Sequence, residues 1–253
     1  MSSNHSIHGE PQEFSLTELK MQYADLLKPY LERFWAHKLT CAPCIAGDSY
    51  EDSPFRLMYV GRAVNGWEAV WKKGTADELA EQVFAHGFKL ASITEEPIQN
   101  GYNFNRSPFW QLCKELMKLA GEENHWSDRV LWSNLYKLAP YQTGNPGNKL
   151  IADTIEYCVR ILQYEINLYR PKHAVFVTDA WWFDPSDTFN TSFAQKLGIL
   201  VKHSTKDVIV GKGIHHSDRA DNVKIVVTKR PEGLNISREK HAEMIFNAFA
   251  SLD

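Results

Sequence analysis

The sequence has no long hydrophobic run, few cysteines and little net charge. No stretch of about 18 apolar residues occurs, so a membrane-spanning helix is not expected. The segment Met1–Phe14 is polar and lacks the apolar centre of a secretory signal peptide, so we expect a flexible tail there and a cytoplasmic protein without a membrane partner. The formal net charge of -3 neither requires nor forbids a nucleic-acid partner.

Four cysteines and no secretory signal favour reduced thiols or a metal site over a framework of disulfides. What the chain does have is apolar side chains. Of its 253 residues, 43% are hydrophobic and 12% are aromatic, which is ample for a sizeable core. No composition shift marks a boundary, so residues 15–253 are expected to form a single domain.

Short apolar runs alternate with segments of helical periodicity. The capping pattern of Ser15 and Glu18 starts a helix expected to reach Trp35, with a kink or break at Pro29. The alternation predicts a three-layer α/β/α fold with a mostly parallel central sheet of about four strands. These strands are expected at Arg56–Val60, Val130–Asn134, His173–Val177 and Lys224–Thr228, and a last helix at Ser237–Phe249.

In sheets of this kind, ligands bind outside the carboxyl ends of the strands. The loops of interest therefore follow Val60, Trp132, Val177 and Val227. Polar residues there either line a pocket or only supply the turns that every strand end needs. Asp179 and Asp184 carry the same two alternatives, whereas the pair His215–His216 is either a metal or catalytic site or a solvated loop. Loop structure is the expectation for all four residues.

Several short motifs in these loops occur in a characteristic order. They are Cys41–Cys44, Leu57–Gly66, Asn103–Ser107, Val130–Pro140, Asn145–Pro146, a helix containing Cys158, Tyr169–Val177 and Arg230–Arg238. In this order and spacing they resemble the uracil-DNA glycosylase superfamily, most closely its iron–sulfur branch. The resemblance covers roughly residues 41–238 and implies a uracil-DNA glycosylase-like fold.

The resemblance implies a pocket for a base flipped out of DNA. It places Gly61, Arg62 and Ala63 around the base, Phe104 as the ring that stacks on it, and Asn134 as the amide that reads its edge. Without the resemblance, Phe104 is equally an ordinary core residue and Asn134 a polar cap at a strand end.

The same resemblance implies DNA contacts after the last strand. Leu234 takes the place of an apolar wedge, while Lys229, Ser237 and Arg238 are candidates for holding phosphates. The alternative is an exposed loop with solvated side chains.

The usual catalytic groups are missing. Arg62 stands where the resembled branch has Glu, and the nearby polar residues Asn65 and Glu68 are the candidate replacements. Arg230 stands where the family has its His, so a guanidinium would either stabilise a leaving anion or bind a phosphate.

The resemblance also implies metal ligands. Cys41, Cys44 and Cys158 match three ligands of an iron–sulfur cluster, but Leu138 takes the fourth place, and such clusters usually need four thiolates. We therefore expect no cofactor, with a cluster as the alternative.

Two functions follow from the resemblance. One is a divergent glycosylase that recognises a modified base in DNA and hydrolyses its N-glycosidic bond. The other is an inactive module of the same fold that binds nucleic acid, a nucleotide or a free nucleobase. A third class, an enzyme using the same loops on a small polar metabolite, remains open.

Overall fold

A central sheet organises the protein. The computed structural model describes residues 14–64, 70–99, 102–142, 144–218 and 222–252. The strand order of the sheet is β2-β6-β3-β8-β10-β9. The strands span Ile45–Ala46 (β2), Val130–Tyr136 (β6), Leu57–Ala63 (β3), His173–Val177 (β8), Val223–Thr228 (β10) and Ile209–His215 (β9).

The four middle strands are parallel, and β2 and β9 are antiparallel edge strands. The predicted α/β class and mostly parallel sheet are confirmed, although six strands form the sheet instead of about four. β9 was missed because Gly211 and Gly213 resemble loop residues, yet both lie within it.

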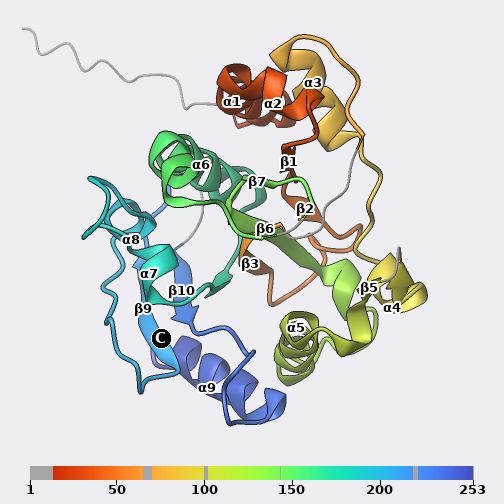
Figure 1. The fold of residues 1–253 in the computed structure, drawn as a ribbon. Helices are drawn as coiled ribbons and strands as arrows, with labels where there is room; N and C mark the ends of the chain where they lie inside the picture. The colour runs from red at the N-terminus through yellow and green to blue at the C-terminus, as the bar shows by residue number, and fades with distance from the viewer. Residues whose placement is uncertain (1–13, 65–69, 100–101, 143, 219–221, 253) are drawn as a thin grey trace, which may run out of the picture.

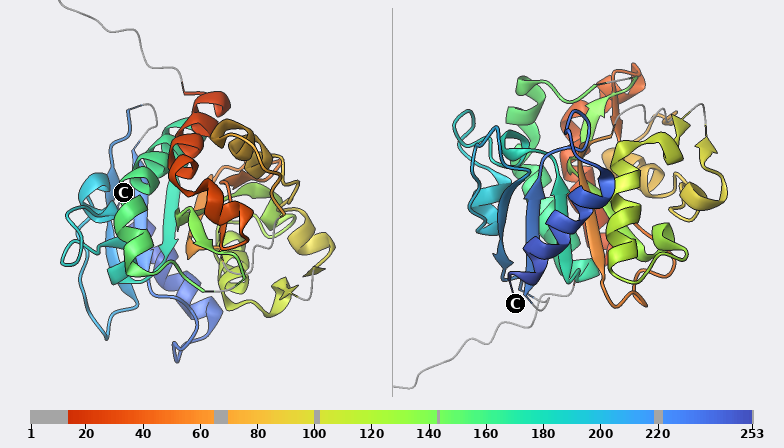
Figure 2. Two further views of the ribbon diagram at one scale, coloured as in Figure 1. Left: turned by 45° about the horizontal axis from the view of Figure 1, so that its top comes forward. Right: turned by 90° about the horizontal axis from the view of Figure 1, so that it is seen from below.

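Helices cover both faces of the sheet (Figures 1 and 2). One face packs against α1 (Leu16–Leu27), α3 (Ala76–Phe84), α6 (Asn148–Tyr169), α7 (Ala180–Phe183) and α8 (Phe193–Leu197). The other face packs against α5 (Pro108–Leu119) and α9 (Arg238–Ala250). Side chains alternate along the strands, so successive residues of Leu57–Val60 in β3 and of Val130–Trp132 in β6 enter the two different cores.

Local signals set the helix ends. The Ser15 hydroxyl accepts the N–H of Glu18, and α1 stops at Leu27, followed by a 3₁₀ turn, Lys28–Tyr30, and α2, Leu31–Trp35. The predicted break at Pro29 is thus confirmed, since a proline inside a helix removes one hydrogen bond of the ladder. Ser237 caps α9 in the same way by accepting the N–H of Lys240 at 3.2 Å.

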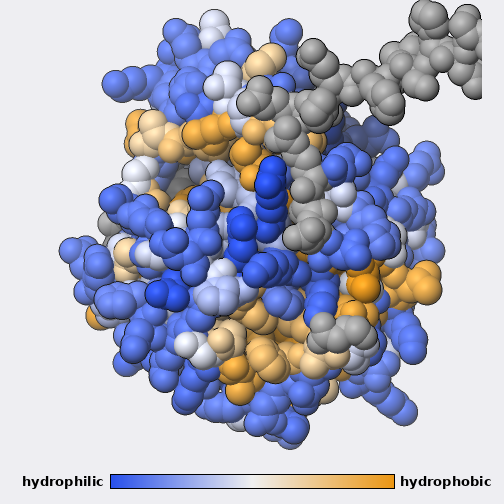
Figure 3. All heavy atoms as spheres, turned by 180° about the vertical axis from the view of Figure 1, so that it is seen from behind, coloured by the Kyte–Doolittle hydropathy of each residue, from blue (hydrophilic) through white to orange (hydrophobic). Residues whose placement is uncertain are grey.

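Smaller elements complete the description. β1 (Leu39–Cys41) pairs antiparallel with β7 (Leu138–Pro140), and β4 (Ile98–Gln99) pairs antiparallel with β5 (Tyr102–Asn103). The remaining elements are α4 (Ser92–Glu95) and two 3₁₀ turns, Phe104–Arg106 and Trp126–Arg129. From behind, the surface is mostly hydrophilic with separate hydrophobic patches (Figure 3). No helix in the described ranges has the length and apolarity needed to cross a bilayer.

Candidate functional site

The topology of the sheet singles out one position for a ligand. The first parallel strand, β3, lies between the second, β6, and the third, β8, so the strand order reverses beside β3. In open α/β sheets, ligands bind at the carboxyl ends of strands where the order reverses in this way. In this chain that place contains the residues after Val60 and Val177, and β10 brings its own end next to β8.

Gly61 and Asn134 lie side by side at this edge. They are register partners in β3 and β6, and a Cβ on Gly61 would lie only 2.7 Å from the Asn134 Oδ1 atom. A larger residue there would force the Asn134 amide to shift. The predicted loop at Gly61 is wrong, because β3 continues to Ala63, which pairs with Tyr136.

The amide of Asn134 is buried but not fully satisfied. The residue is 3% exposed, and its Nδ2 has no hydrogen-bond partner among the described residues. A buried polar group without a partner costs about 1–3 kcal/mol and is uncommon in folded proteins. The donor is thus available to a ligand. The predicted strand end at Asn134 is wrong, because β6 continues for two further residues to Tyr136.

The aromatic ring beside Gly61 belongs to Phe109, not to Phe104. Two ring atoms of Phe109 lie 3.5 Å from the Cβ position of Gly61, and the Tyr59 hydroxyl donates to the Phe109 carbonyl oxygen at 2.6 Å. Phe104 is 9% exposed and contacts the rings of Phe88, Tyr102 and Trp110. The structure therefore places Phe104 in an aromatic core and Phe109 next to Asn134.

Arg62 points to the opposite face of the sheet from Asn134. Its guanidinium pairs with the Asp179 carboxylate, donates from Nε to the Thr178 carbonyl oxygen at 3.0 Å and lies 5.2 Å from the ring centre of Trp182. Burial, followed by the charge of Arg230, lowers the pKa of Arg62 to about 10 against an opposing effect of Glu232. Arg62 thus stays cationic at neutral pH and cannot serve as a base.

Asp179 joins the ends of three strands. One carboxylate oxygen pairs with Arg62 of β3, and the other accepts the backbone N–H of Arg230 at 3.2 Å. Its backbone has φ 68° and ψ 164°, a region that is occupied almost only by glycine. Residues held in such conformations cluster at functional sites, so the strain marks Asp179, which sequence reasoning had treated as loop structure.

The loop after β10 carries a pair of opposite charges. Arg230 donates from Nε and Nη2 to the two carboxylate oxygens of Glu232 at 3.0 and 2.6 Å. Burial alone would raise the pKa of Glu232, but the hydrogen bonds and charge of Arg230 lower it, so this carboxylate is ionised. Arg238, near the start of α9, holds the loop by donating to the Pro231 carbonyl oxygen at 2.7 Å.

This loop and the ends of β3 and β8 surround a shallow depression of about 400 Å³, which we call the rim depression. Lys229, which also lines it, donates from Nζ to the Thr205 carbonyl oxygen at 2.6 Å. Ser237 is occupied as the cap of α9. The residues lining the depression include Arg62, Asp179, Lys229, Arg230, Glu232 and Leu234.

The sequence predicts that Gly61, Phe104, Asn134 and Arg230 converge on one cleft. The structure brings Gly61 and Asn134 together, and it connects Arg230 to the neighbouring strand end through Asp179. It places Phe104 elsewhere, and neither Gly61 nor Asn134 lines the rim depression. The candidate catalytic residues Asn65 and Glu68 lie outside the described residues.

The three candidate cluster ligands, Cys41, Cys44 and Cys158, all lie in the core between the sheet and α6, but they supply only three of the four thiolates that such a cluster usually needs. Leu138, at the fourth place, pairs with Cys41 across two strands. The neighbouring Lys137 ammonium is fully buried and pairs with Glu165 at 2.8 Å, so an ion pair occupies this region. In the described part of the chain, no group of three metal-ligating side chains is arranged to hold an ion.

The thiols in this region are protonated. Burial raises the pKa of Cys158 to about 11 and the pKa values of Cys41 and Cys44 further above the ordinary range. Glu165 also accepts from Ser133 Oγ at 2.7 Å and from the Tyr23 hydroxyl at 3.0 Å. The sequence does not reveal that Lys137 is buried. Lysine is usually exposed unless it is paired, and its partner Glu165 lies far along the chain.

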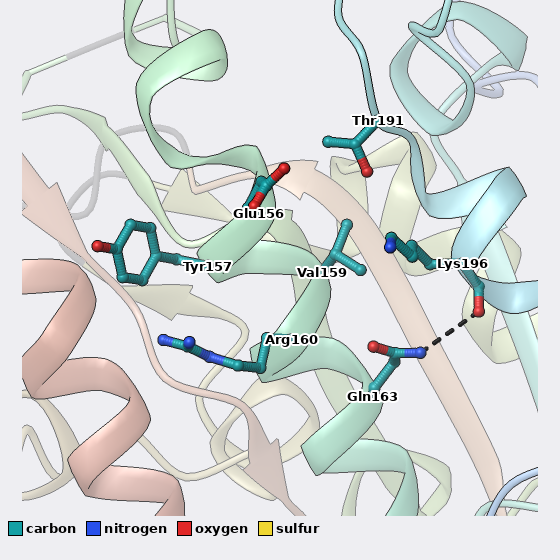
Figure 4. Close-up of a pocket in the computed structure, with 7 residues that line it drawn as sticks. All are labelled: Glu156, Tyr157, Val159, Arg160, Gln163, Thr191 and Lys196. Atoms are coloured by element: carbon teal, nitrogen blue, oxygen red, sulfur yellow. Dashed lines mark hydrogen bonds between the residues drawn. The ribbon is translucent and has the colours of Figure 1, made fainter.

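A second hollow, of about 420 Å³, lies on the outer side of α6 and shares no lining residue with the rim depression (Figure 4). Charged side chains of both signs, Glu156, Arg160 and Lys196, surround it. The Gln163 amide bridges to α8 by donating to the Lys196 carbonyl oxygen at 3.3 Å.

No family model matches the chain, and no curated protein is similar to it.

Proposed function

We propose that this protein recognises a nucleobase exposed from DNA and that the amide of Asn134 reads the edge of the base. The observation that carries the proposal is the buried Asn134 Nδ2 donor, which has no partner in the described part of the chain and lies next to a glycine and the Phe109 ring. An amide offers both a donor and an acceptor, which suits the edge of a base, and an aromatic ring stacks on any base.

Three further features support a nucleic-acid ligand. Gly61, the register partner of Asn134, lies near the carboxyl end of β3, the strand beside which the strand order reverses. Arg62, Lys229 and Arg230 line the neighbouring rim depression, and their positive charge favours a phosphate backbone there. The order of the sequence motifs resembles that of uracil-DNA glycosylases, which bind such a base in order to cleave it from the sugar.

The proposed activity is hydrolysis of the N-glycosidic bond of a modified base. Water adds to the sugar carbon, the base leaves with the electrons of the broken bond, and a proton from the water ultimately returns to the base. Arg230 at the rim would stabilise negative charge on the departing base. Asp179, one of two carboxylates that line the rim depression, is the candidate to take the place of the missing Glu.

A base-release assay tests this proposal. Single- and double-stranded oligonucleotides with uracil, hypoxanthine and other deaminated purines are incubated with the protein, and free base is measured. We expect release from at least one of them and a loss of about tenfold or more in Asn134→Ala, because one base-reading interaction is removed. Asn247→Ala, an exposed change on α9, is the matched control and should behave like the wild type.

The second candidate is a module that binds without cleaving. The observation that favours it is the Arg62–Asp179 pair, which puts a cation where a glycosylase needs a carboxylate and occupies the acid that is present. It predicts salt-dependent DNA binding that Arg238→Ala weakens and that the exposed change Arg33→Ala does not. If the protein binds DNA but releases no base from any substrate, this candidate is selected. If it shows no binding and no release, both candidates are refuted.

A further inference from the structure

Glu232 holds the guanidinium of Arg230 in the geometry that a phosphate would use. Two parallel hydrogen bonds, at 3.0 and 2.6 Å, join the two side chains as a fork. Arginine binds carboxylates and phosphates through the same planar, two-pronged arrangement. This donor pair at the rim depression is therefore occupied by the carboxylate of Glu232, two residues further along the same loop.

The pair is accessible enough to be exchanged. The side chains of Arg230 and Glu232 are 35% and 39% exposed. Ion pairs this open to water contribute only about 0–1 kcal/mol, so an incoming ligand with more negative charge can displace the carboxylate. Gly233, with a φ of 83°, continues the loop directly after Glu232, which places the carboxylate on a turn that only glycine favours.

The surroundings of the fork remain positive when Glu232 leaves. Arg62 and Lys229 line the same depression, and Asp179 is already paired with Arg62. Asp179 also fixes the backbone of Arg230, so the guanidinium keeps its anchor when its partner changes. Once Glu232 has left, the charged groups lining the depression are two guanidinium groups, one ammonium group and one carboxylate, so the positive charges outnumber the negative one.

We propose that the Arg230 fork is a phosphate-binding site and that Glu232 is a built-in competitor which occupies it until a phosphate group displaces the carboxylate. The inference rests on the proposed nucleic-acid role of this site. The phosphate belongs either to a DNA strand or to a free nucleotide, and both present the same oxygens to the fork.

A double-mutant cycle with three probes tests the proposal. Affinity for inorganic pyrophosphate, thymidine 5′-monophosphate and oligothymidylate is measured by titration calorimetry for wild type, Glu232→Gln, Arg230→Gln and the double variant. We expect Glu232→Gln to tighten binding by about three- to tenfold, because the competing charge is gone. We expect no such gain in the Arg230→Gln background, because the fork is absent there.

Glu123→Gln is the control for net charge, since Glu123 is exposed and precedes the amino end of β6, on the opposite edge of the sheet. A gain restricted to oligothymidylate assigns the phosphate to a DNA strand, and a gain with pyrophosphate and the mononucleotide assigns it to a free nucleotide. No gain with any probe, or a gain that persists without Arg230, overturns the proposal. Pyrophosphate contains no base, so its result does not depend on whether Asn134 reads one.

Discussion

The carboxylate of Asp179 accepts the backbone N–H of Arg230 at 3.2 Å and so ties the end of β8 to the loop after β10. The same side chain pairs with Arg62 at the end of β3. One residue thus sets the relative positions of the three segments that form the rim depression. It does so from a backbone conformation that is unfavourable for any residue with a Cβ.

This conformation predicts an unusual order of stability. Asp179→Ala and Asp179→Gly both lose the carboxylate contacts, but only glycine relieves the strain at φ 68°. We expect the glycine variant to be more stable than the alanine variant by about 1 kcal/mol, the reverse of the usual order. Urea unfolding of the two variants measures the difference, and equal stabilities would show that the backbone there is not strained.

Gly61 provides a second test, on the packing around Asn134. In Gly61→Ala the new methyl group would lie 2.7 Å from Asn134 Oδ1, so we expect a loss of about 1–3 kcal/mol in the free energy of unfolding. Gly147→Ala is the control because no described atom lies within 4 Å of its Cβ position and its φ is -76°, so its cost is limited to that of an alanine at the N-cap of α6, at most about 1 kcal/mol. A Gly61→Ala protein as stable as the control would mean that the amide has room to move.

The buried ion pair predicts a large effect from a single change. Lys137→Met leaves the Glu165 carboxylate buried without its cation, which we expect to cost about 3–5 kcal/mol in chemical denaturation. Lys20→Met breaks the more exposed pair with Glu81 and should cost less than about 1 kcal/mol. Similar losses in the two variants would contradict the importance of burial.

His241 predicts how stability depends on pH. The side chain is fully buried, its Nε2 is 2.7 Å from the Thr228 hydroxyl, and burial followed by the charge of Arg238 lowers its pKa to about 4. The unfolded chain takes up this proton near pH 6.5 and the folded protein only near pH 4, so stability falls as the pH drops between these values, by up to about 3 kcal/mol. Well above pH 6.5 the imidazole is neutral in both the folded and the unfolded state, so it does not make the free energy of unfolding depend on pH.

Urea unfolding at a series of pH values checks this dependence against His241→Gln. The variant has no imidazole to protonate, so it should lose the part of the slope that the histidine causes. His203→Gln, a change in the segment between α8 and β9, serves as the control. An unchanged slope in His241→Gln would assign the acid sensitivity to other groups.

Much of the fold could be predicted because its signals are local. Capping residues such as Ser15 and Ser237 set helix starts, and apolar runs such as His173–Val177 form the parallel strands. β9 could not be predicted, since pairing with β10 overrides the turn preference of its glycines. Tertiary pairing of this kind leaves no trace in a short window of sequence.

The candidate site could be predicted only in part. Strand ends pointed to Gly61 and Asn134, whose proximity follows from the register of β3 and β6. The choice between Phe104 and Phe109 depends on how α5 packs on the sheet, and both residues lie near its start. The buried position of Lys137 depends on a carboxylate 28 residues away on α6, a partner that no periodicity reveals.

The edges of the central sheet are poorly suited to adding another strand. β2 contributes only two residues, and β9 carries an exposed Lys212 and forms a bridge to Val201 through Gly211. A strand from another molecule could form few consecutive backbone hydrogen bonds with either edge, and at β9 it would lie next to the charge of Lys212. The architecture thus resists the edge-to-edge association that leads to aggregation, and it leaves the carboxyl rim as the place where the sheet can meet another molecule.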